Sequence, residues 1–211
     1  MSFDRLIPDT LDFLRALSGN NTRDWFNANK TTYDSQLKAP ALLLLEDMAA
    51  RLTRLTGQRT ITKLFRPHRD VRFSKDKTPY HTHLHLLWTS ADGGQWFFGI
   101  SPDYVTAGAG RMGFDKKALA AYRANLPGQG AALLSAVTAL LTQGARLSDP
   151  ELKRPAAPIT PDDPLADLAR RKSLAVWFDY ETPPLGLPGR LEQDFTRLWP
   201  LQQALSSALG T

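Results

Sequence analysis

The sequence predicts an α+β fold, in which helices pack on a mostly antiparallel sheet. Apolar residues recur every three or four positions up to residue 57, as in amphipathic helices. Between residues 64 and 107 the period changes to two, and short turns interrupt it, as in a meander of antiparallel strands. Helical patterns return after residue 115. A length of 211 residues, with 42% hydrophobic and 22% charged residues, is typical of a single globular domain spanning 1–211.

The N-terminal part, residues 9–57, is predicted to be helical. A first helix capped at Asp9 or Thr10 ends near residue 18, and a second begins after Asn21 or Thr22. Trp25 and Phe26 lie on the apolar stripe of the second helix, so we expect them in the core. Pro40 breaks or restarts this helix because proline has no N–H to donate. A further amphipathic helix covers residues 42–55 and ends at Gly57.

The sheet is predicted within residues 62–107, as a meander from about 64. Residues 64–74 have the pattern of a strand, followed by a loop at 74–79. Alternate residues of a strand share a face, so this strand would place Arg66, His68, Asp70 and Arg72 together. Further strands are expected at 82–89, 96–100 and 104–107, separated by turns.

The C-terminal half is predicted to return to the sheet once. Helices are expected at 115–126 and 133–141, within the segment 115–143. Residues 146–164 contain five prolines and are expected to form an irregular arm. The closing segment, 172–209, should hold a strand near 173–179 and a helix at 191–209, preceded by a short helix at 165–171.

The strongest functional signal is a basic stretch between Lys63 and Lys77. It contains six Lys or Arg and two Asp, a net charge of +4, while the whole chain has a net charge of +5. Guanidinium groups bind phosphate or carboxylate through two parallel hydrogen bonds, so the stretch is a candidate anion site. The predicted ligand-binding residues are Arg66, Arg69, Arg72, Ser74, Lys75 and Lys77.

Three other interpretations of the basic stretch stay open at this point. It could belong to an enzyme in which Asp70 or Asp76 is the general base, with Tyr80 or His68 as further catalytic candidates. It could bind nucleic acid, with phosphates on the cations and bases stacked on nearby aromatic rings. It could also be a structural network in which Arg69, Asp70, Arg72 and Asp76 hold the sheet to the helices.

The four histidines all fall between residues 68 and 85. His81, His83 and His85 would share one face of a strand, a spacing compatible with a transition-metal site. The alternative is three partly exposed polar residues on the outer face of a sheet. No cofactor is strongly implied.

Two further stretches carry recognisable patterns. Residues 108–113 fit G-x-G-x-x-G, but they end an antiparallel meander rather than open a βαβ unit. We therefore expect a tight strand-to-helix connection, with Phe114 and Asp115 as staple and cap. Lys153 and Arg154, in the proline-rich arm, are expected to be solvated, unless the arm folds back to the basic stretch.

Composition limits the class of protein. With no cysteine, the chain has no disulfide and no thiolate metal site, which fits a reducing compartment. The N-terminus lacks a basic region followed by an apolar run, and no segment approaches ~18 consecutive apolar residues. We expect a cytoplasmic protein that does not bind membranes. Its expected partner is an anionic small molecule, with nucleic acid as the second possibility, and the oligomeric state is left undefined.

Several of these stretches together resemble a family called domain of unknown function 2461. They are residues 20–26, 65–80, 108–110 and 152–155, with Asp163, Pro164 and Lys172 downstream. The resemblance spans nearly the whole chain and implies one soluble domain of mixed α and β structure, with no established activity. The family pattern usually has Lys after Tyr80, where this chain has His81. The shared set that the resemblance points to is Arg66, Arg69, Asp70, Arg72, Lys75, Asp76, Lys77 and Tyr80.

Overall fold

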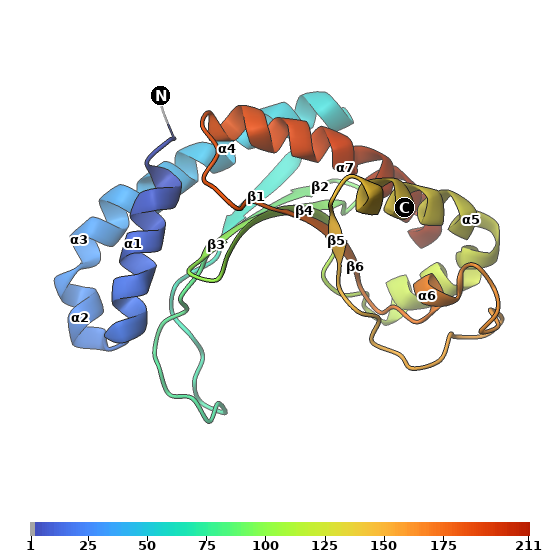
Figure 1. Ribbon diagram of the computed structural model, residues 1–211, viewed down its shortest axis with the longest axis horizontal. Helices are drawn as coiled ribbons and strands as arrows, with labels where there is room; N and C mark the ends of the chain where they lie inside the picture. Colours follow the sequence, from blue (N-terminus) through green and yellow to red (C-terminus); the bar gives the residue numbers. More distant parts are fainter. Residues whose placement is uncertain (1–2) are drawn as a thin grey trace. The chain divides into compact units, whose positions relative to one another are not determined.

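The structure is a computed structural model that describes residues 3–211 (Figure 1). It confirms the α+β class: within these residues six strands form one open antiparallel sheet in the order β1-β2-β3-β4-β6-β5, with helices packed on it. The strands are β1 (Thr60–Leu64), β2 (Leu84–Ser90), β3 (Gln95–Ser101), β4 (Tyr104–Arg111), β5 (Arg146–Leu147) and β6 (Leu174–Asp179). The helices are α1 (Leu6–Gly19), α2 (Arg23–Ala28), α3 (Lys30–Thr32), the π-helix η1 (Tyr33–Lys38), α4 (Ala39–Thr56), α5 (Lys116–Thr142), α6 (Ala166–Ala169) and α7 (Leu187–Leu209).

The chain divides into two compact units, which we describe separately. The first comprises residues up to 88 together with 97–107 and 179–193. The second comprises 89–96, 108–178 and 194–211. The single domain expected from chain length and composition stays a prediction.

The N-terminal helices of the first unit confirm one of the two predicted caps. The cap expected at Asp9 or Thr10 is wrong, because α1 begins at Leu6 and both residues lie inside it. The Thr22 hydroxyl accepts a hydrogen bond from the Trp25 N–H (3.2 Å) and so caps α2. Phe26 is buried against the rings of Phe13 and Tyr33, with centroids 6.1 and 5.2 Å away. Trp25 is half-buried beside Phe13. These aromatic contacts form the core between the first helices.

Pro40 lies in the first turn of α4, and the chain stays helical on both sides of it. The π-helix η1 comes immediately before. Its wider turn fits a proline, which has no N–H for the helical ladder and whose ring crowds the preceding carbonyl groups. Gly57 ends α4 as predicted, with a φ of 71°. The indole N–H of Trp88 in β2 donates to the Leu45 carbonyl (2.9 Å), which fixes α4 on the sheet.

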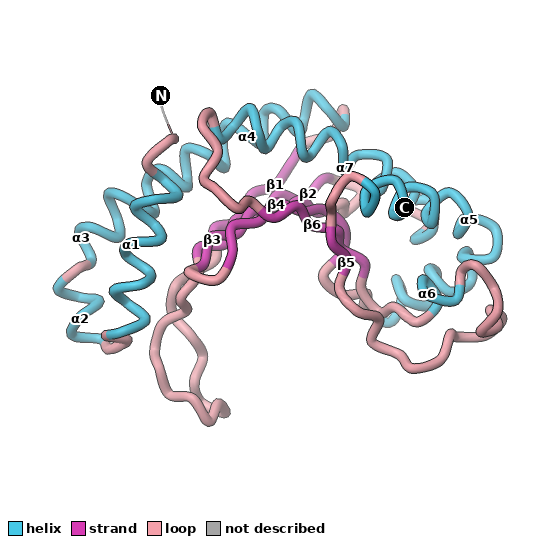
Figure 2. The backbone as a smooth tube through the Cα atoms, viewed as in Figure 1, coloured by secondary structure: helices cyan, strands magenta, loops and turns pink. Residues whose placement is uncertain are grey.

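The predicted strand at 64–74 is wrong. The strand β1 covers Thr60–Leu64, and residues 65–83 form a long loop, here called the basic loop, between β1 and β2 (Figure 2). Its two arms are joined by an isolated bridge between His68 and Tyr80, with the His81 N–H bonded to the Pro67 carbonyl (2.7 Å). Pro67 lacks the N–H that a continuous ladder needs. The four residues that strand alternation placed on one face are therefore not aligned on a strand.

The predicted glycine connection at 108–113 needs correction, because β4 continues to Arg111. Gly108 and Gly110 therefore lie within this strand, in the part that belongs to the second unit. A Cβ at Gly108 would be 2.7 Å from the Val176 carbonyl oxygen of β6, so the absence of a side chain lets two strands approach closely. The expected cap is present: the Ala118 N–H donates to the Asp115 carboxylate (2.8 Å) at the start of α5.

The two helices predicted at 115–126 and 133–141 are one continuous helix, α5, with Pro127 inside it. Leu126, Gly130 and Leu133 are buried, so packing of this face offsets the hydrogen bond that Pro127 removes. The Tyr122 hydroxyl donates to the Leu168 carbonyl (3.1 Å) and joins α5 to α6.

The proline-rich arm of the second unit and the closing segment, 172–209, are close to expectation. The arm is irregular except for β5, in which Arg146 pairs with Trp177 of β6. The closing helix α7 packs its Trp199 ring on Trp96, with ring centroids 6.0 Å apart. The strand and helix predicted for the closing segment are thus both present, and α7 begins four residues earlier than predicted.

We predict that Gly110→Ala lowers the free energy of unfolding by about 2 kcal/mol or more. The φ of Gly110 is +137°, and a Cβ there would collide with the Leu174 carbonyl oxygen and lie 2.7 Å from the Ala175 Cα. The matched control is Gly113→Ala, since nothing lies within 4 Å of a Cβ at that position. Urea unfolding of both variants checks the difference, and equal stabilities would contradict the close approach.

Candidate functional site

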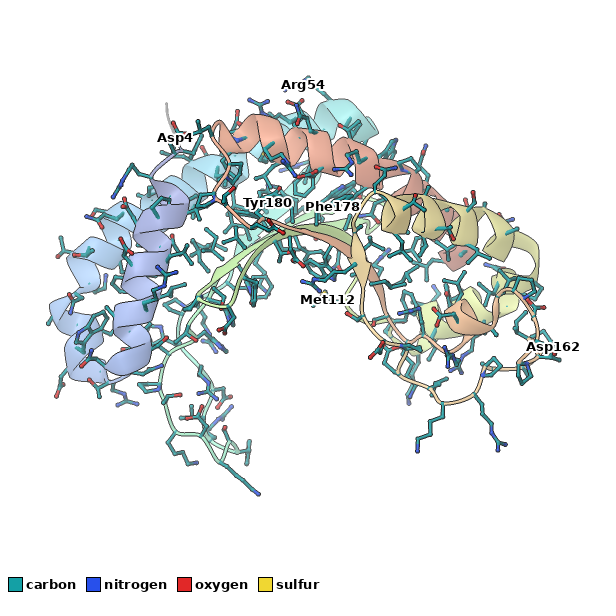
Figure 3. The ribbon with its side chains drawn as sticks, in the orientation of Figure 1. Asp4, Arg54, Met112, Asp162, Phe178 and Tyr180 are labelled. Carbon is teal, nitrogen blue, oxygen red and sulfur yellow. The ribbon has the colours of Figure 1, made fainter. Side chains whose placement is uncertain are left out.

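The basic loop extends beyond the ends of β1 and β2 and carries most of the predicted site residues (Figures 1 and 2). Nitrogen-bearing side chains extend outward from it in Figure 3. Because the loop has almost no regular secondary structure, side-chain hydrogen bonds determine where its charges lie. Two Arg–Asp pairs and an anchor to the N-terminal helices supply these hydrogen bonds.

The base of the loop is anchored by Asn21 and Tyr80. The Asn21 side chain donates to the Tyr80 carbonyl (2.9 Å) and accepts from the Tyr80 N–H (3.1 Å). The Tyr80 ring is 4% exposed and stacks on Phe26, with centroids 4.1 Å apart and planes 13° apart. Tyr80, a catalytic candidate from the sequence, therefore belongs to the aromatic core of the first unit and fixes one arm of the loop to it.

Asp76 orders the second arm of the basic loop, which leads from the tip to β2. Its carboxylate accepts hydrogen bonds from the Thr78 N–H (2.9 Å), the Thr78 hydroxyl (2.9 Å) and Nη1 of Arg69 (2.5 Å). The Thr78 N–H bond, followed by the Arg69 bond, lowers the pKa of Asp76 to about 2. Asp76 is thus a charged acceptor near neutral pH, and it holds Arg69 in place.

Arg69 uses one side of its guanidinium group for this network. Nη1 bonds to the Asp76 carboxylate, to the Thr78 hydroxyl and to the Thr78 carbonyl (3.2 Å). Its Nε–H and Nη2–H make no hydrogen bond within residues 3–211. These two donors are parallel and form the edge that binds two oxygens of a phosphate or carboxylate group.

A second pair lies nearer the tip of the loop. Nε and Nη2 of Arg72 donate to the two oxygens of Asp70, at 3.0 and 2.7 Å. These bonds lower the pKa of Asp70, and the charge of Arg66 lowers it further by a smaller amount. The Arg72 side chain is 77% exposed, so the pair restrains its position while leaving the cation in water. The Lys77 ammonium donates to the Val71 carbonyl (3.0 Å) and so links the two arms.

A polar cleft of about 520 Å³ lies where the basic loop meets the connection between α1 and α2. It is lined by Ser18, Asn21, Arg69, Asp76, Thr78, Tyr80, His81, Thr82 and His83. Of the residues predicted from sequence, the cleft brings together Arg69, Asp76, Tyr80, His81 and His83. It does not include Arg66, Asp70, Arg72, Ser74, Lys75 or Lys77, which lie elsewhere on the loop.

Sequence reasoning missed the hydroxyl and amide groups of the cleft. Thr78 stands two residues after Asp76, the spacing at which an Asp side chain bonds the following backbone, so local turn chemistry offered a signal for it. Ser18 and Asn21 are more than 40 residues away from the basic loop in the chain, and no local pattern indicates that they reach it.

The three histidines of the predicted metal site form a stack. The rings of His81 and His83 are 4.7 Å apart, and those of His83 and His85 are 3.8 Å apart with planes 12° apart. The Nε2 atom of His85 is 2.7 Å from the Tyr104 hydroxyl oxygen. Parallel stacked rings do not converge on a common point, and the described part of the chain contains no group of three His, Cys, Asp or Glu that could hold a metal ion.

Burial keeps the stacked imidazoles neutral near pH 7. It lowers the pKa of His83 and His85 to about 4, and the neighbouring imidazoles contribute to the same direction. Burial also lowers the pKa of His81, followed by the positive charges of Arg69 and Arg66. The guanidinium of Arg66 thus acts electrostatically on the cleft, although it does not line it.

We predict an acid-dependent loss of stability from the histidine stack. Each imidazole has an ordinary pKa of 6.5, and for His83 and His85 the folded-state value is about 4, so the unfolded chain binds more protons. The free energy of unfolding should be greatest above pH 6.5 and fall between pH 6.5 and 4, by at most about 1.4 kcal/mol per pH unit for each histidine.

Urea unfolding from pH 7.5 to 4 tests this pH dependence. His83→Gln should flatten the fall. The matched control, His68→Gln, removes an exposed histidine outside the stack. An unchanged slope in His83→Gln would contradict the assignment.

Two sequence-based alternatives have different outcomes. The glycines at 108 and 110 lie in β4, so they form no phosphate-binding loop there. Lys153 and Arg154 belong to the second unit, whereas the basic loop belongs to the first, so their proposed approach to the loop stays a prediction.

The described residues contain no candidate membrane span. No helix among residues 3–211 combines the length and the apolar character needed to cross a bilayer.

The fold and the loop define an α+β protein with a polar cleft beside a cation-rich loop. The chain belongs to the family described as Conserved hypothetical protein (DUF2461), whose model matches residues 9–203. This match confirms the family resemblance seen in the sequence. No curated protein and no solved structure matches the chain.

Proposed function

We propose that this is a cytoplasmic protein that binds an anionic, phosphate-bearing ligand at the basic loop, with Arg69 as the principal contact. The observation that carries the proposal is the Nε–H and Nη2–H edge of Arg69, which makes no hydrogen bond in the described residues although Asp76 and Thr78 hold the other side of the group. A guanidinium already held in position loses little conformational entropy when it binds an anion.

The chemistry of the cleft supports this role. The hydroxyl group of Thr82 lines it together with Arg69 and can donate to phosphate oxygens, whereas the Ser18 hydroxyl donates to the Leu14 carbonyl (2.8 Å). The neutral imidazoles of His81 and His83 each retain one ring N–H as a further donor. The cleft therefore combines one charged fork with several neutral donors, a set suited to a phosphate group.

Cations outside the cleft support the proposal through long-range attraction. Arg66 and Lys75 are exposed, and neither forms a hydrogen bond or an ion pair with any described residue. The charge of Arg66 acts on both Asp70 and His81. A local excess of positive charge raises the concentration of anions near the cleft and speeds their association.

Binding is favoured over the catalytic alternative by the state of the two carboxylates. The pKa of Asp76 is about 2, and that of Asp70 is also lowered. A general base works best when its pKa is close to the working pH, so both carboxylates would be weak bases near neutrality. Tyr80, the third catalytic candidate, stacks on Phe26 in the aromatic core.

We predict that pyrophosphate and sulfate raise the melting temperature of the protein. A ligand at ~100 times its dissociation constant stabilises the folded state by roughly 2.7 kcal/mol, which thermal unfolding detects. Arg69→Lys keeps the charge but removes the parallel donors. It should weaken binding roughly 10- to 100-fold, the range of a hydrogen bond to a charged group.

Two further variants complete this test. Arg66→Gln should weaken binding by a smaller factor without affecting folding, since Arg66 is exposed and forms no hydrogen bond in the described chain. The control is Arg54→Gln, which removes an exposed cation on α4, labelled in Figure 3. The control should bind anions as the unmodified protein does. The proposal fails if no anion stabilises the protein, or if Arg69→Lys binds anions as tightly as the unmodified protein does.

A further inference from the structure

Phe73, in the basic loop, is almost fully exposed. Its side chain is 94% exposed, more than any other large apolar side chain in the described residues. Single exposed apolar residues are common on protein surfaces, so exposure alone indicates nothing. The surroundings of Phe73 make its exposure informative about function, because charged residues are close to it in the sequence and hydrogen bonds order the backbone around it.

The tip of the loop is held by bonds that involve the residues next to Phe73. The Ser74 N–H donates to the Val71 carbonyl (3.3 Å), which closes a backbone turn that contains Phe73. The Lys77 ammonium donates to the same carbonyl from the other arm. Asp70 restrains Arg72 through two hydrogen bonds. These bonds therefore order the backbone that carries Phe73, although its ring contributes little to the core.

Cations lie on both sides of Phe73 in the sequence, and one of them is close to the ring. The guanidinium of Arg72 is 5.9 Å from the centroid of the Phe73 ring, and Lys75 follows two residues later with no ion pair in the described chain. An accessible aromatic ring beside cations is the combination that binds a nucleobase and its neighbouring phosphates.

We propose that the basic loop binds single-stranded nucleic acid, with a base stacked on Phe73 and phosphates on the surrounding cations. This inference rests on the proposed function and names the class of its ligand. One phosphate occupies the free edge of Arg69 in the cleft, and the strand runs along the loop toward its tip.

The spacing of the two contacts sets the length of the strand. Four residue steps separate Arg69 from Phe73, at most about 14 Å of extended chain. A stacked strand advances about 3.4 Å per nucleotide, so at most roughly four nucleotides span this distance. Affinity should rise with the length of the strand up to about this size.

Nucleic acid fits these observations better than a lipid surface. Membrane insertion gains energy in proportion to the apolar area that enters the bilayer. At the tip of the loop a single phenyl ring is exposed, and Arg72, Ser74, Lys75 and Asp76 surround it in the sequence. Stacking needs one accessible ring face, which Phe73 provides.

The test compares a fluorescent oligothymidylate of ten nucleotides with an abasic oligonucleotide of the same length and charge. Fluorescence anisotropy at fixed salt measures both affinities. The unmodified protein should bind the oligothymidylate roughly tenfold or more tightly than the abasic strand, the effect of one base–aromatic stack. Phe73→Ala should abolish this difference while retaining affinity for the abasic strand.

Matched variants separate stacking from general apolar contact. Phe73→Tyr should preserve the preference for bases, whereas Phe73→Leu should lose it. Leu185→Ala is the control, since Leu185 is 86% exposed on the same unit but lies outside the basic loop. Circular dichroism confirms folding of each variant.

The remaining outcomes overturn the inference. If the protein binds both strands equally and Phe73→Ala does not change this, base stacking on Phe73 is refuted, while anion binding at the loop is supported. No binding of either strand refutes the nucleic-acid ligand, and the sulfate and pyrophosphate measurements then decide the proposed function separately. If Phe73→Ala loses binding to vesicles that contain phosphatidylserine but still binds the oligonucleotide as the unmodified protein does, the ring contacts a lipid surface instead.

Discussion

The candidate site depends on the hydrogen bonds of the Asp76 carboxylate. Asp76 accepts from the backbone and hydroxyl of Thr78 and from one nitrogen of Arg69, so it shapes the loop and positions a cation at the same time. Because Asp76 holds only one side of the guanidinium, the other side is available to a ligand. Without these carboxylates, the cationic side chains of the loop would repel one another. The Asp70–Arg72 pair has the same effect nearer the tip.

The N-terminal helices matter to the site because they anchor this loop. Tyr80 stacks on Phe26, and Asn21 bonds both polar groups of the Tyr80 backbone, so the arm that carries Thr78 and Asp76 starts from a fixed point. The cleft lies at this junction. From it the chain leads toward β2 through His81 and His83, whose half-buried, neutral rings give the cleft donors that add no charge near pH 7.

Local signals predicted much of the fold. The caps at Thr22 and Asp115 and the glycine at 57 depend on neighbouring residues, so the sequence indicates them. The prediction of a strand at 64–74 was wrong. Phe65, Val71 and Phe73 alternate in the sequence as in a strand, but Phe73 is exposed to water and packs against no sheet core. Packing of Gly130 against Leu165 keeps α5 continuous through Pro127, and that contact is not local.

The site was predictable in part for the same reason. Charge counting found Arg69 and Asp76, whereas Ser18 and Asn21 reach the cleft through the tertiary fold. The central claim is that a ligand anion occupies the free edge of Arg69. The most direct measurement is the Nε–H resonance of Arg69 by NMR, assigned by its loss in Arg69→Lys, during titration with pyrophosphate. A saturable shift of this resonance with slowed exchange is expected. A resonance that stays unchanged while pyrophosphate binds would contradict the account.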